Sequence, residues 1–316
     1  MQAVSVIVPT MRRPESLERA LRSLFAQTVV EDRLASIVVV DNDPAGTARE
    51  TVARLTADSP CSLYYRHEPR PGVATARNAG LGMTTAPLIA FLDDDEGAST
   101  GWLSALLDAL ETTRADVVFG PIRGCVPAGT GWATPYLERF FGREGPAETR
   151  LIDQAYGCGN SLMVRATALP GPAPFDASAD QSGGEDDALF AALHARGGRF
   201  GWAAEAWVDE FAPSHRATMR YALSRAFAYG QGPSQTAAKA RDGIGVARWM
   251  VIGLVQTGVW GLAAIAMTII AHPARAMLMD RTARGLGKVF WMKGFEPHFY
   301  GARELARLDR ISPSAA

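Results

Sequence analysis

Apolar runs and segments of helical periodicity alternate along the first 125 residues of the chain. The apolar runs have the length and composition of buried strands and are predicted at residues 4–8, 36–40, 63–65, 88–92 and 116–120. The segments between them are predicted as helices at residues 14–27, 46–55, 73–83 and 102–112. Strands that are apolar throughout and separated by amphipathic helices are typical of a parallel sheet covered on both faces, so we predict an α/β fold.

The pattern is less regular further along the chain. Residues 124–150 are rich in glycine, proline and aromatic side chains, which indicates a long loop over an edge of the sheet. Residues 156–164 predict a further strand, and residues 188–195 predict a helix that acidic residues open. We predict a first region at residues 1–125, a second half of the same domain at 126–232, and a helical C-terminal region at 233–316.

Residues 249–271 form the most apolar segment and carry no charged side chain. The segment is long enough to cross a bilayer, but glycines dilute it and basic residues flank both of its ends. The positive-inside rule places both flanks on the cytosolic side, so we expect a re-entrant or interface-lying hairpin broken near Gly258–Gly261 rather than a simple span. A buried core helix is the alternative. Basic flanks beside apolar surface suit an anionic cytoplasmic leaflet.

Composition limits the classes of function. The chain has 316 residues, of which 47% are hydrophobic and 21% charged, as is ordinary for a globular enzyme. The net charge of −1 predicts no nucleic-acid partner. Three widely spaced cysteines indicate a reducing compartment rather than a disulfide framework. The N-terminus lacks a basic segment and runs directly into a predicted strand, so we expect no signal peptide and a cytosolic start.

Three consecutive aspartates, Asp93, Asp94 and Asp95, follow the apolar run 88–92. Neighbouring carboxylates repel one another, so this arrangement costs stability unless a cation or hydrogen-bond donors compensate it. Hard oxygen ligands at a fixed strand end suit Mg²⁺ or Mn²⁺ and the phosphates that these ions accompany. A solvated acidic turn is the alternative. Two other strand ends carry polar groups, and ligands of such sheets bind at the carboxyl ends of the strands.

Five motifs in this order and spacing resemble glycosyltransferase family 2. They are Val-Ser-Val-Ile-Val-Pro-Thr, Val-Val-Val-Asp-Asn, Gly-Val-Ala-Thr-Ala-Arg-Asn-Ala-Gly, Phe-Leu-Asp-Asp-Asp and Gly-Glu-Asp-Asp. The resemblance covers about residues 4–230 and implies an inverting nucleotide-sugar enzyme with a GT-A fold, a Rossmann-like and mostly parallel sheet. The segments Thr10–Pro14 and Glu210–Arg216 are further similar to the bacterial exopolysaccharide branch, of the succinoglycan-assembly kind.

The resemblance also implies roles for individual residues. Asp93 and Asp95 correspond to the DxD pair, with Asp95 as the direct ligand of Mg²⁺ or Mn²⁺ and His215 as a further candidate ligand. Asp186 corresponds to the catalytic base, with Glu185 and Asp187 as near alternatives. The residues expected to bind the nucleotide donor are Pro9, Thr10, Arg13, Asp41, Asn42, Arg77, Asp93, Asp94 and Arg216. Asn42 stands where many members have a second aspartate.

These expectations lead to one main hypothesis and two alternatives. The main hypothesis is transfer of a sugar from a nucleotide diphosphate donor, with UDP expected, to a lipid-linked or polysaccharide acceptor hydroxyl at the cytoplasmic face of the inner membrane. A sugar-phosphate nucleotidyltransferase needs a glycine-rich basic loop after the first strand, where this chain has Pro9-Thr10-Met11. A non-catalytic membrane-bound scaffold with a degenerate nucleotide site is the other alternative, and two intact acidic motifs argue against it.

Overall fold

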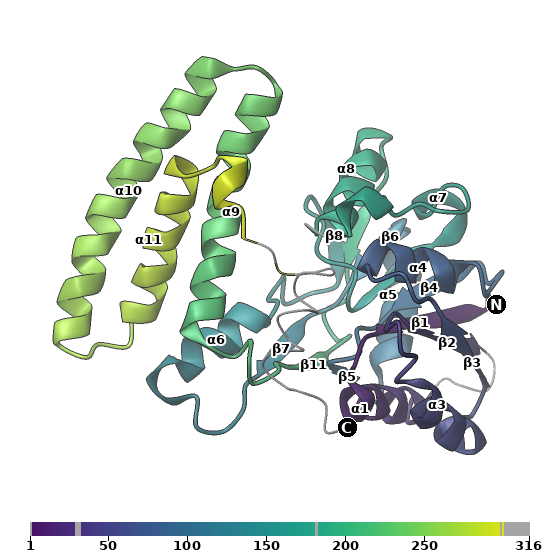
Figure 1. Ribbon diagram of the computed structural model, residues 1–316. Coiled ribbons are helices and arrows are strands. Elements are labelled where there is room, and N and C mark those ends of the chain that lie inside the picture. The colour runs from purple at the N-terminus through teal and green to yellow at the C-terminus, as the bar shows by residue number, and fades with distance from the viewer. Residues whose placement is uncertain (1, 29–32, 181–182, 298, 300–316) are drawn as a thin grey trace. The chain divides into compact units, whose positions relative to one another are not determined.

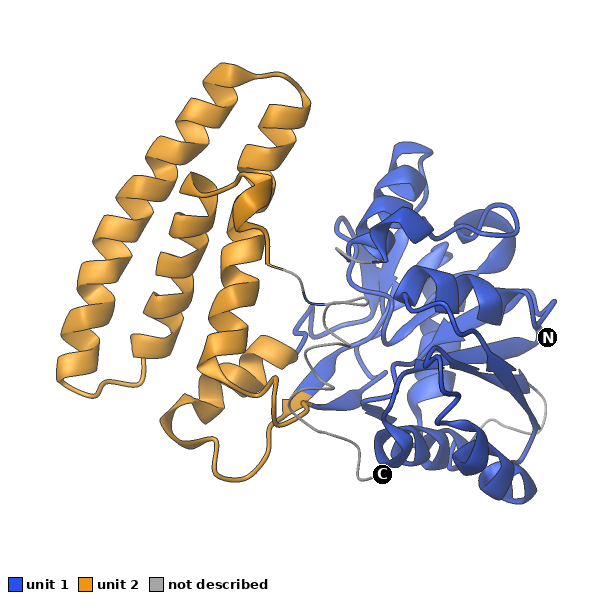
Figure 2. Ribbon diagram, viewed as in Figure 1, with its two compact units in different colours: residues 1–123, 142–211, 298–316 blue, residues 124–141, 212–297 orange. Residues whose placement is uncertain are grey.

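The computed structural model describes residues 2–28, 33–180, 183–297 and 299 of the chain. The chain forms two compact units (Figure 2). The first contains the described residues up to Arg123 together with Gly142–Phe211, and the second contains Gly124–Phe141 and Ala212–Pro297. The two units are defined by how the chain packs. The three regions predicted from the sequence were defined by their expected roles, and that division stays a prediction.

An eight-stranded, mostly parallel sheet forms the centre of the first unit (Figure 1). Its order is β3-β2-β1-β4-β9-β6-β10-β8, in which β9 and β8 run antiparallel to their neighbours. The strands are β1 (Val4–Thr10), β2 (Leu34–Asp41), β3 (Ser62–His67), β4 (Leu88–Phe91), β6 (Val117–Phe119), β8 (Arg150–Ile152), β9 (Ser161–Val164) and β10 (Phe200–Trp202). The predicted α/β fold is therefore confirmed.

Helices cover both faces of this sheet, because its central strands are apolar on both sides. Along β1, Val4, Val6 and Val8 pack in one core with α1 (Pro14–Phe25), α3 (Arg49–Leu55) and α5 (Trp102–Thr113). Ile7 points the other way and packs in a second core with α4 (Val73–Leu81), α7 (Arg165–Ala168) and α8 (Glu185–Ala195). The alternation of side chains along a strand accounts for this division.

The carboxyl ends of three parallel strands meet at one edge of the sheet. The register pairs Thr10 at the end of β1 with Asp41 at the end of β2, and β4 runs parallel on the other side of β1. A second sheet of three strands has the order β5-β11-β7. Its strands are β5 (Glu96–Ala98), β11 (Val208–Phe211) and β7 (Ile122–Cys125). Since β5 directly follows the aspartate triplet, the second sheet fixes the triplet from its C-terminal side.

The second unit is helical and corrects one expectation. Residues 124–150 were expected to be a long loop, but they contain α6 (Thr134–Phe141). Leu137 of α6 is buried against Ala222 of α9 (Met219–Lys239), so tertiary packing stabilises a helix that glycine and proline content disfavoured. The other helices are α10 (Gly243–Ile269) and α11 (Arg275–Val289), and short 3₁₀ turns lie at residues 56–58, 131–133, 177–179 and 293–295.

The most apolar segment is one continuous helix, so the predicted break near Gly258–Gly261 is wrong. Two glycines cost helix propensity, at about 1 kcal/mol each, but α10 continues through both (Figure 1). Only 11% of its most apolar stretch is buried, so α10 is not a buried core helix of this chain. Within the part of the chain that the structure describes, α10 is the helix that is long and apolar enough to cross a membrane.

Glycines let the three long helices of the second unit approach closely. A Cβ built on Gly253 of α10 would lie 2.6 Å from the carbonyl oxygen of Gly285 in α11. A Cβ on Gly287 of α11 would collide with the carbonyl oxygen of Phe227 in α9. Gly258 has open space around it. Gly253 and Gly287 thus permit close packing of the helices, whereas Gly258 has no such role.

We expect Gly287→Ala to destabilise the second unit by about 1–3 kcal/mol, because a methyl group there must push two helix backbones apart. The matched control Gly258→Ala adds a methyl group in open space, and we expect it to stabilise α10 by up to about 1 kcal/mol. Thermal unfolding in a mild detergent, followed by circular dichroism, compares the two variants. Equal stability of both variants would contradict the close packing of α9 and α11.

Candidate active site

The aspartate triplet lies at the carboxyl edge of the large sheet and is compensated by protein donors. Asp94 is buried and accepts hydrogen bonds from the Thr10 hydroxyl at 2.8 Å and from the Arg13 guanidinium at 2.9 Å. The same Arg13 nitrogen lies 2.7 Å from Asp95. The solvated acidic turn is therefore excluded, and Thr10, Arg13, Asp94 and Asp95 form one cluster, while their binding of donor and metal stays a prediction.

Burial raises the pKa of several carboxyl groups in this cluster. Burial raises the pKa of Asp94 to about 6, against the opposing charge of Arg13. Burial also raises the pKa of Asp93, with Arg77 opposing and with the charges of Asp95 and Asp186 adding to the rise. This dense negative charge, of which Asp94 and Asp95 are mostly shielded from water and Asp93 is partly exposed, attracts cations.

Arg77 connects the aspartate triplet to the start of α8. Its guanidinium is buried, forms an ion pair with Glu185, and lies 3.6 Å from Asp93. The rings of Phe91 and Phe175 lie 5.9 and 5.7 Å from it. Burial raises the pKa of Glu185, against Arg77, and the neighbouring Asp186 contributes less. Burial, rather than crowding with the neighbouring carboxylates, is therefore the main cause of the raised pKa of Glu185.

Asp186 lies on the same side as the triplet and keeps a solvent-accessible side chain. Its Oδ2 atom accepts a hydrogen bond from the backbone N–H of Cys158 at 3.2 Å. A Cβ on Gly157 would lie 3.3 Å from the same oxygen, so a larger residue there would crowd the carboxylate. Since the charge of Asp186 acts on Asp93, the acidic start of α8 and the tip of β4 belong to one cluster.

Asp41 and Asn42 make contacts that were not predicted. Asp41 is fully buried and accepts hydrogen bonds from the Ala48 N–H at 2.7 Å and the Tyr65 hydroxyl at 2.9 Å. Asn42 donates to the carbonyl oxygens of residues 68 and 70, and its amide oxygen accepts from the N–H of Gly72 at 2.7 Å. An aspartate could not donate these two bonds, which explains the amide. Binding of a nucleotide base by either residue stays a prediction.

Three polar residues support the site without having been predicted, of which Glu96 and Asp180 are buried and Arg143 is partly buried. Glu96 accepts a hydrogen bond from the Asp93 N–H at 2.9 Å, and burial raises its pKa well above the usual range, with the charges of Asp93 and Glu210 adding. Arg143 donates to the carbonyl oxygen of Gly157 at 3.1 Å and opposes that negative charge. Its own pKa is lowered by burial.

Asp180 is the third supporting residue and fixes the loop before α4. It accepts a hydrogen bond from the Ala74 N–H at 2.8 Å and one from the Thr75 hydroxyl. A Cβ on Gly72 would collide with its carboxylate. Glu96 could have been found in the sequence because it follows the aspartates, whereas Arg143 and Asp180 lie in segments without a pattern.

The remaining predicted site residues are placed as follows. Pro9 precedes Thr10 within β1 of the first unit. His215 and Arg216 belong to the second unit, where they precede α9, and the Arg216 guanidinium lies 5.8 Å from the ring of Tyr221. Their roles in binding metal and diphosphate stay predictions.

The residues at the tip of β4 fit a divalent cation that arrives with a phosphate ligand. Among the described residues, no group of three His, Cys, Asp or Glu side chains is arranged as a metal site. Mg²⁺ in phosphate sites usually needs only one or two protein carboxylates, because phosphate oxygens and water supply the other ligands. Asp93 and Asp95 provide such oxygens, and the Asp93 side chain is 38% exposed.

Sequence comparison places the chain among glycosyltransferases. The model of the family "Glycosyl transferase family 2" matches residues 5–169. The chain is 32% identical to the succinoglycan biosynthesis protein ExoM of Rhizobium meliloti, over 96% of this chain and 97% of that protein. It is 31% identical to the GalNAc(5)-diNAcBac-PP-undecaprenol beta-1,3-glucosyltransferase of Campylobacter jejuni, over 37% of each chain.

Solved structures of low sequence identity share the fold. The structure of S. aureus TarS residues 1–349 in complex with UDP aligns with a TM-score of 0.52 at 16% identity, over 95% of this chain and 99% of that chain. The structure of GalNAc-T7 with UDP, GalNAc and Mn²⁺ aligns with a TM-score of 0.54 at 16% identity, over 75% and 51% of the two chains. These likenesses concern the fold alone, and the expected GT-A fold is confirmed.

Proposed function

Because the chain belongs to glycosyl transferase family 2 and is a glycosyltransferase, we propose that it transfers a sugar from a nucleotide diphosphate donor to a lipid-linked saccharide. UDP is the nucleotide we favour, since the structure of TarS 1–349 is a complex with UDP. A lipid-linked acceptor is supported by the undecaprenol-linked substrate in the name of the Campylobacter jejuni relative. The relative from Rhizobium meliloti supports a role in exopolysaccharide synthesis.

One observation carries the proposal. Arg77 contacts both Asp93 at the tip of β4 and Glu185 at the start of α8, so two acidic motifs that are far apart in the sequence form one charged cluster. Transfer with inversion needs a site for the diphosphate and a carboxylate that removes the proton of the acceptor hydroxyl. In our proposal Asp93 and Asp95 serve the diphosphate, and Asp186 is the base.

The protein groups divide the work as follows. Asp186 takes the proton of the acceptor hydroxyl, and the Cys158 N–H holds its carboxylate in place. Asp94, fixed by Thr10 and Arg13, binds the ribose hydroxyls. Asp93 and Asp95 would hold Mg²⁺ or Mn²⁺, and the bound cation would supply positive charge that neutralises the negative charge developing on the leaving diphosphate.

Binding of the donor tests the assignment of Asp95 to the diphosphate and metal site. We expect UDP to bind the purified full-length chain in the presence of Mn²⁺, and Asp95→Asn to weaken that binding by at least about tenfold, as measured by calorimetric titration. Membranes that contain the wild-type chain should transfer sugar from a UDP-sugar to extracted lipid-linked saccharides, detected by mass spectrometry. Absence of both binding and transfer would indicate the non-catalytic scaffold, and binding without transfer from any nucleotide sugar would refute the proposed reaction.

Donor binding should depend on pH because protons compete with the ligands of the cluster. The pKa of Asp94 is raised to about 6, so this side chain takes up a proton as the pH falls through that value and loses acceptor capacity. We expect the affinity for UDP with Mn²⁺ to fall at least about tenfold between about pH 7.5 and about pH 5. A titration series over this range tests it, and a constant affinity would contradict the assignment of Asp94 to the donor site.

We also propose that α10 attaches the enzyme to the cytoplasmic face of the inner membrane. Leu262 and Ile265 of α10 are 72% and 61% exposed, and Arg248 and Arg275 lie just outside the uncharged stretch of residues 249–271. Exposed apolar surface flanked by cations suits an anionic lipid surface.

Vesicle flotation tests this attachment. The wild-type chain should float with vesicles that contain anionic lipid, and the double variant Leu262→Glu with Ile265→Glu should stay largely in the soluble fraction, because two carboxylates oppose insertion and are repelled by the lipid. Leu151→Glu, which changes an exposed leucine of the first unit, is the matched control and should float as the wild type does. Flotation of the double variant like the wild type would refute the role of α10.

A further inference from the structure

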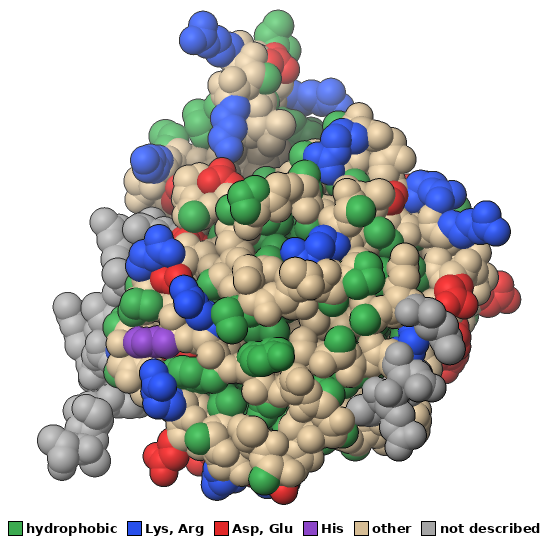
Figure 3. Space-filling view, turned by 90° about the vertical axis from the view of Figure 1, so that its right-hand side faces the viewer, with side chains coloured by type: hydrophobic (Ala, Val, Ile, Leu, Met, Phe, Trp, Pro, Cys, Tyr) green, Lys and Arg blue, Asp and Glu red, His purple; other side chains and the backbone are tan. Residues whose placement is uncertain are grey.

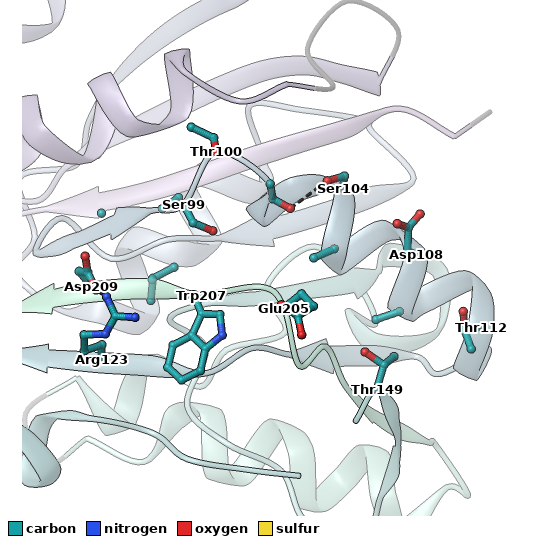
Figure 4. Close-up of a pocket in the computed structure, with 16 residues that line it drawn as sticks. Ser99, Thr100, Ser104, Asp108, Thr112, Arg123, Thr149, Glu205, Trp207 and Asp209 are labelled. Carbon is teal, nitrogen blue, oxygen red and sulfur yellow. Dashed lines mark hydrogen bonds and ion pairs between the residues drawn. The ribbon is translucent and has the colours of Figure 1, made fainter. Parts of the chain in front are cut away.

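A groove of about 770 Å³ lies in the first unit, outside the carboxylate cluster (Figure 4). Its walls come from β5 and the turn after it, from one face of α5, from β7, and from the segment before and within β11. The labelled side chains in Figure 4 are polar except for that of Trp207. Nothing in the proposed reaction uses these residues.

The groove and the carboxylate cluster lie on opposite faces of the second sheet. In the antiparallel pairing of β5 with β11, Glu96 lies opposite Glu210 and Gly97 lies opposite Asp209. Paired residues point to the same face, and the next pair points to the other. Glu96 faces the cluster, since it accepts from the Asp93 N–H. Asp209 faces the groove, so a ligand there lies apart from the donor.

Trp207 provides an aromatic surface in the groove. Trp207 is 36% exposed, and the Arg123 guanidinium lies 5.5 Å from the centre of its ring. Arg123 is in turn held by Asp209 at 3.2 Å, so the tryptophan is supported from one side. An exposed, supported ring is suited to stacking on an apolar face of a ligand while its N–H stays free to donate.

Hydrogen-bonding groups surround this ring. Ser104, Asp108 and Thr112 are spaced four residues apart on α5, so they lie along one face of the helix, and all three line the groove. The described side chains that line the groove include three carboxylates, those of Asp108, Glu205 and Asp209, but only one guanidinium, that of Arg123. An anionic ligand would be repelled, whereas hydroxyl groups can donate to the carboxylates.

We propose that this groove binds a neutral oligosaccharide, a second saccharide site apart from the reacting sugar. A sugar ring has an apolar C–H face for the tryptophan and a rim of hydroxyl groups for the surrounding acceptors, and the groove has the volume of a site for a few sugar rings. The site would hold the neutral part of the glycan that the enzyme extends or has extended. It does not depend on the assigned donor site, because binding here needs neither nucleotide nor metal.

The test is binding of neutral oligosaccharides to the purified full-length chain without donor. A series of tri- and tetrasaccharides of glucose, galactose and mannose is titrated while the indole N–H signals are followed by NMR. We expect at least one member to shift the Trp207 signal, and Trp207→Ala to weaken its binding by at least about tenfold. Trp132→Ala, which changes an exposed tryptophan of the second unit, is the control and should bind as the wild type does.

Further binding measurements distinguish oligosaccharide binding in the groove from the proposed transfer reaction and from nonspecific stacking on the tryptophan. Asp95→Asn should bind the oligosaccharide with wild-type affinity even where it no longer transfers sugar. Asp108→Asn should weaken neutral ligands at least about threefold, through a lost acceptor, while an oligosaccharide that carries carboxylates should bind the wild type more weakly than its neutral counterpart. Absence of binding across the neutral series, or binding that Trp207→Ala leaves unchanged, overturns the proposal.

Discussion

Asp186→Asn should lower kcat by roughly 10²–10⁴-fold while leaving the affinity for UDP close to that of the wild type. The amide has the same shape and still accepts the Cys158 N–H, but it cannot take the proton from an acceptor hydroxyl. Because the change touches the base rather than the donor site, the loss should appear in kcat and not in donor binding. Initial rates of transfer to lipid-linked saccharide, together with calorimetric titration of UDP, measure both quantities.

Two neighbours on the same helix turn serve as controls for that result. Asp187→Asn changes an exposed carboxylate one residue further along α8 and should leave kcat within about threefold of the wild type. Glu185→Gln should disturb the partner of Arg77 and so affect folding as well as rate. A wild-type kcat for Asp186→Asn combined with a large loss for Asp187→Asn would move the base to the other carboxylate.

Arg77→Met should destabilise the first unit by about 3–5 kcal/mol at neutral pH. The variant keeps the apolar contact with Phe91 and Phe175 but leaves Glu185 and Asp93 without the buried cation that compensates them. Chemical unfolding at equilibrium measures the free-energy difference. Arg54→Met removes an exposed ion pair with Glu18 and should change the unfolding midpoint only slightly.

The pH dependence gives this prediction its sign. Burial already raises the folded-state pKa of Glu185, and removing Arg77 should raise it further. Between the unfolded and folded pKa values the folded state binds more protons, so stability falls as the pH rises through that window. The variant should therefore recover stability relative to the wild type as the pH is lowered toward about 5. An equal difference at all pH values would show that lost packing rather than an uncompensated charge causes the destabilisation.

Charged side chains of both signs lie on the surface of the molecule (Figure 3). Figure 3 shows one face of the molecule, on which Lys, Arg, Asp and Glu side chains are interspersed with neutral and hydrophobic ones. Acidic and basic side chains nearly balance over the whole chain, which has a net charge of −1. Strong fields are instead local, as at the aspartate triplet with Arg13 and Arg77.

The sequence alone determined the parts of the protein that local patterns encode. Apolar strands with helical segments between them predicted the α/β sheet, since a strand buried on both faces must be apolar throughout. The triplet Asp93–Asp95 was recognisable because consecutive carboxylates after a buried strand need compensation. The uncharged length of residues 249–271 predicted a membrane-associating hairpin, but the structure has one continuous, largely exposed helix there, and its attachment to a membrane stays a proposal.

Only the tertiary structure decided which distant residues meet. Arg143 and Asp180 support the site from segments without a pattern, because their partners lie on other elements and leave no local trace in the sequence. The amide of Asn42 is explained by the hydrogen bonds that it donates to carbonyl oxygens of the loop after the next strand, β3. Packing also overrode local propensity, since α6 formed where turn residues predicted a loop and α10 continued through its glycines. Local preferences amount to about 1 kcal/mol per residue, and buried contacts between distant residues exceed them.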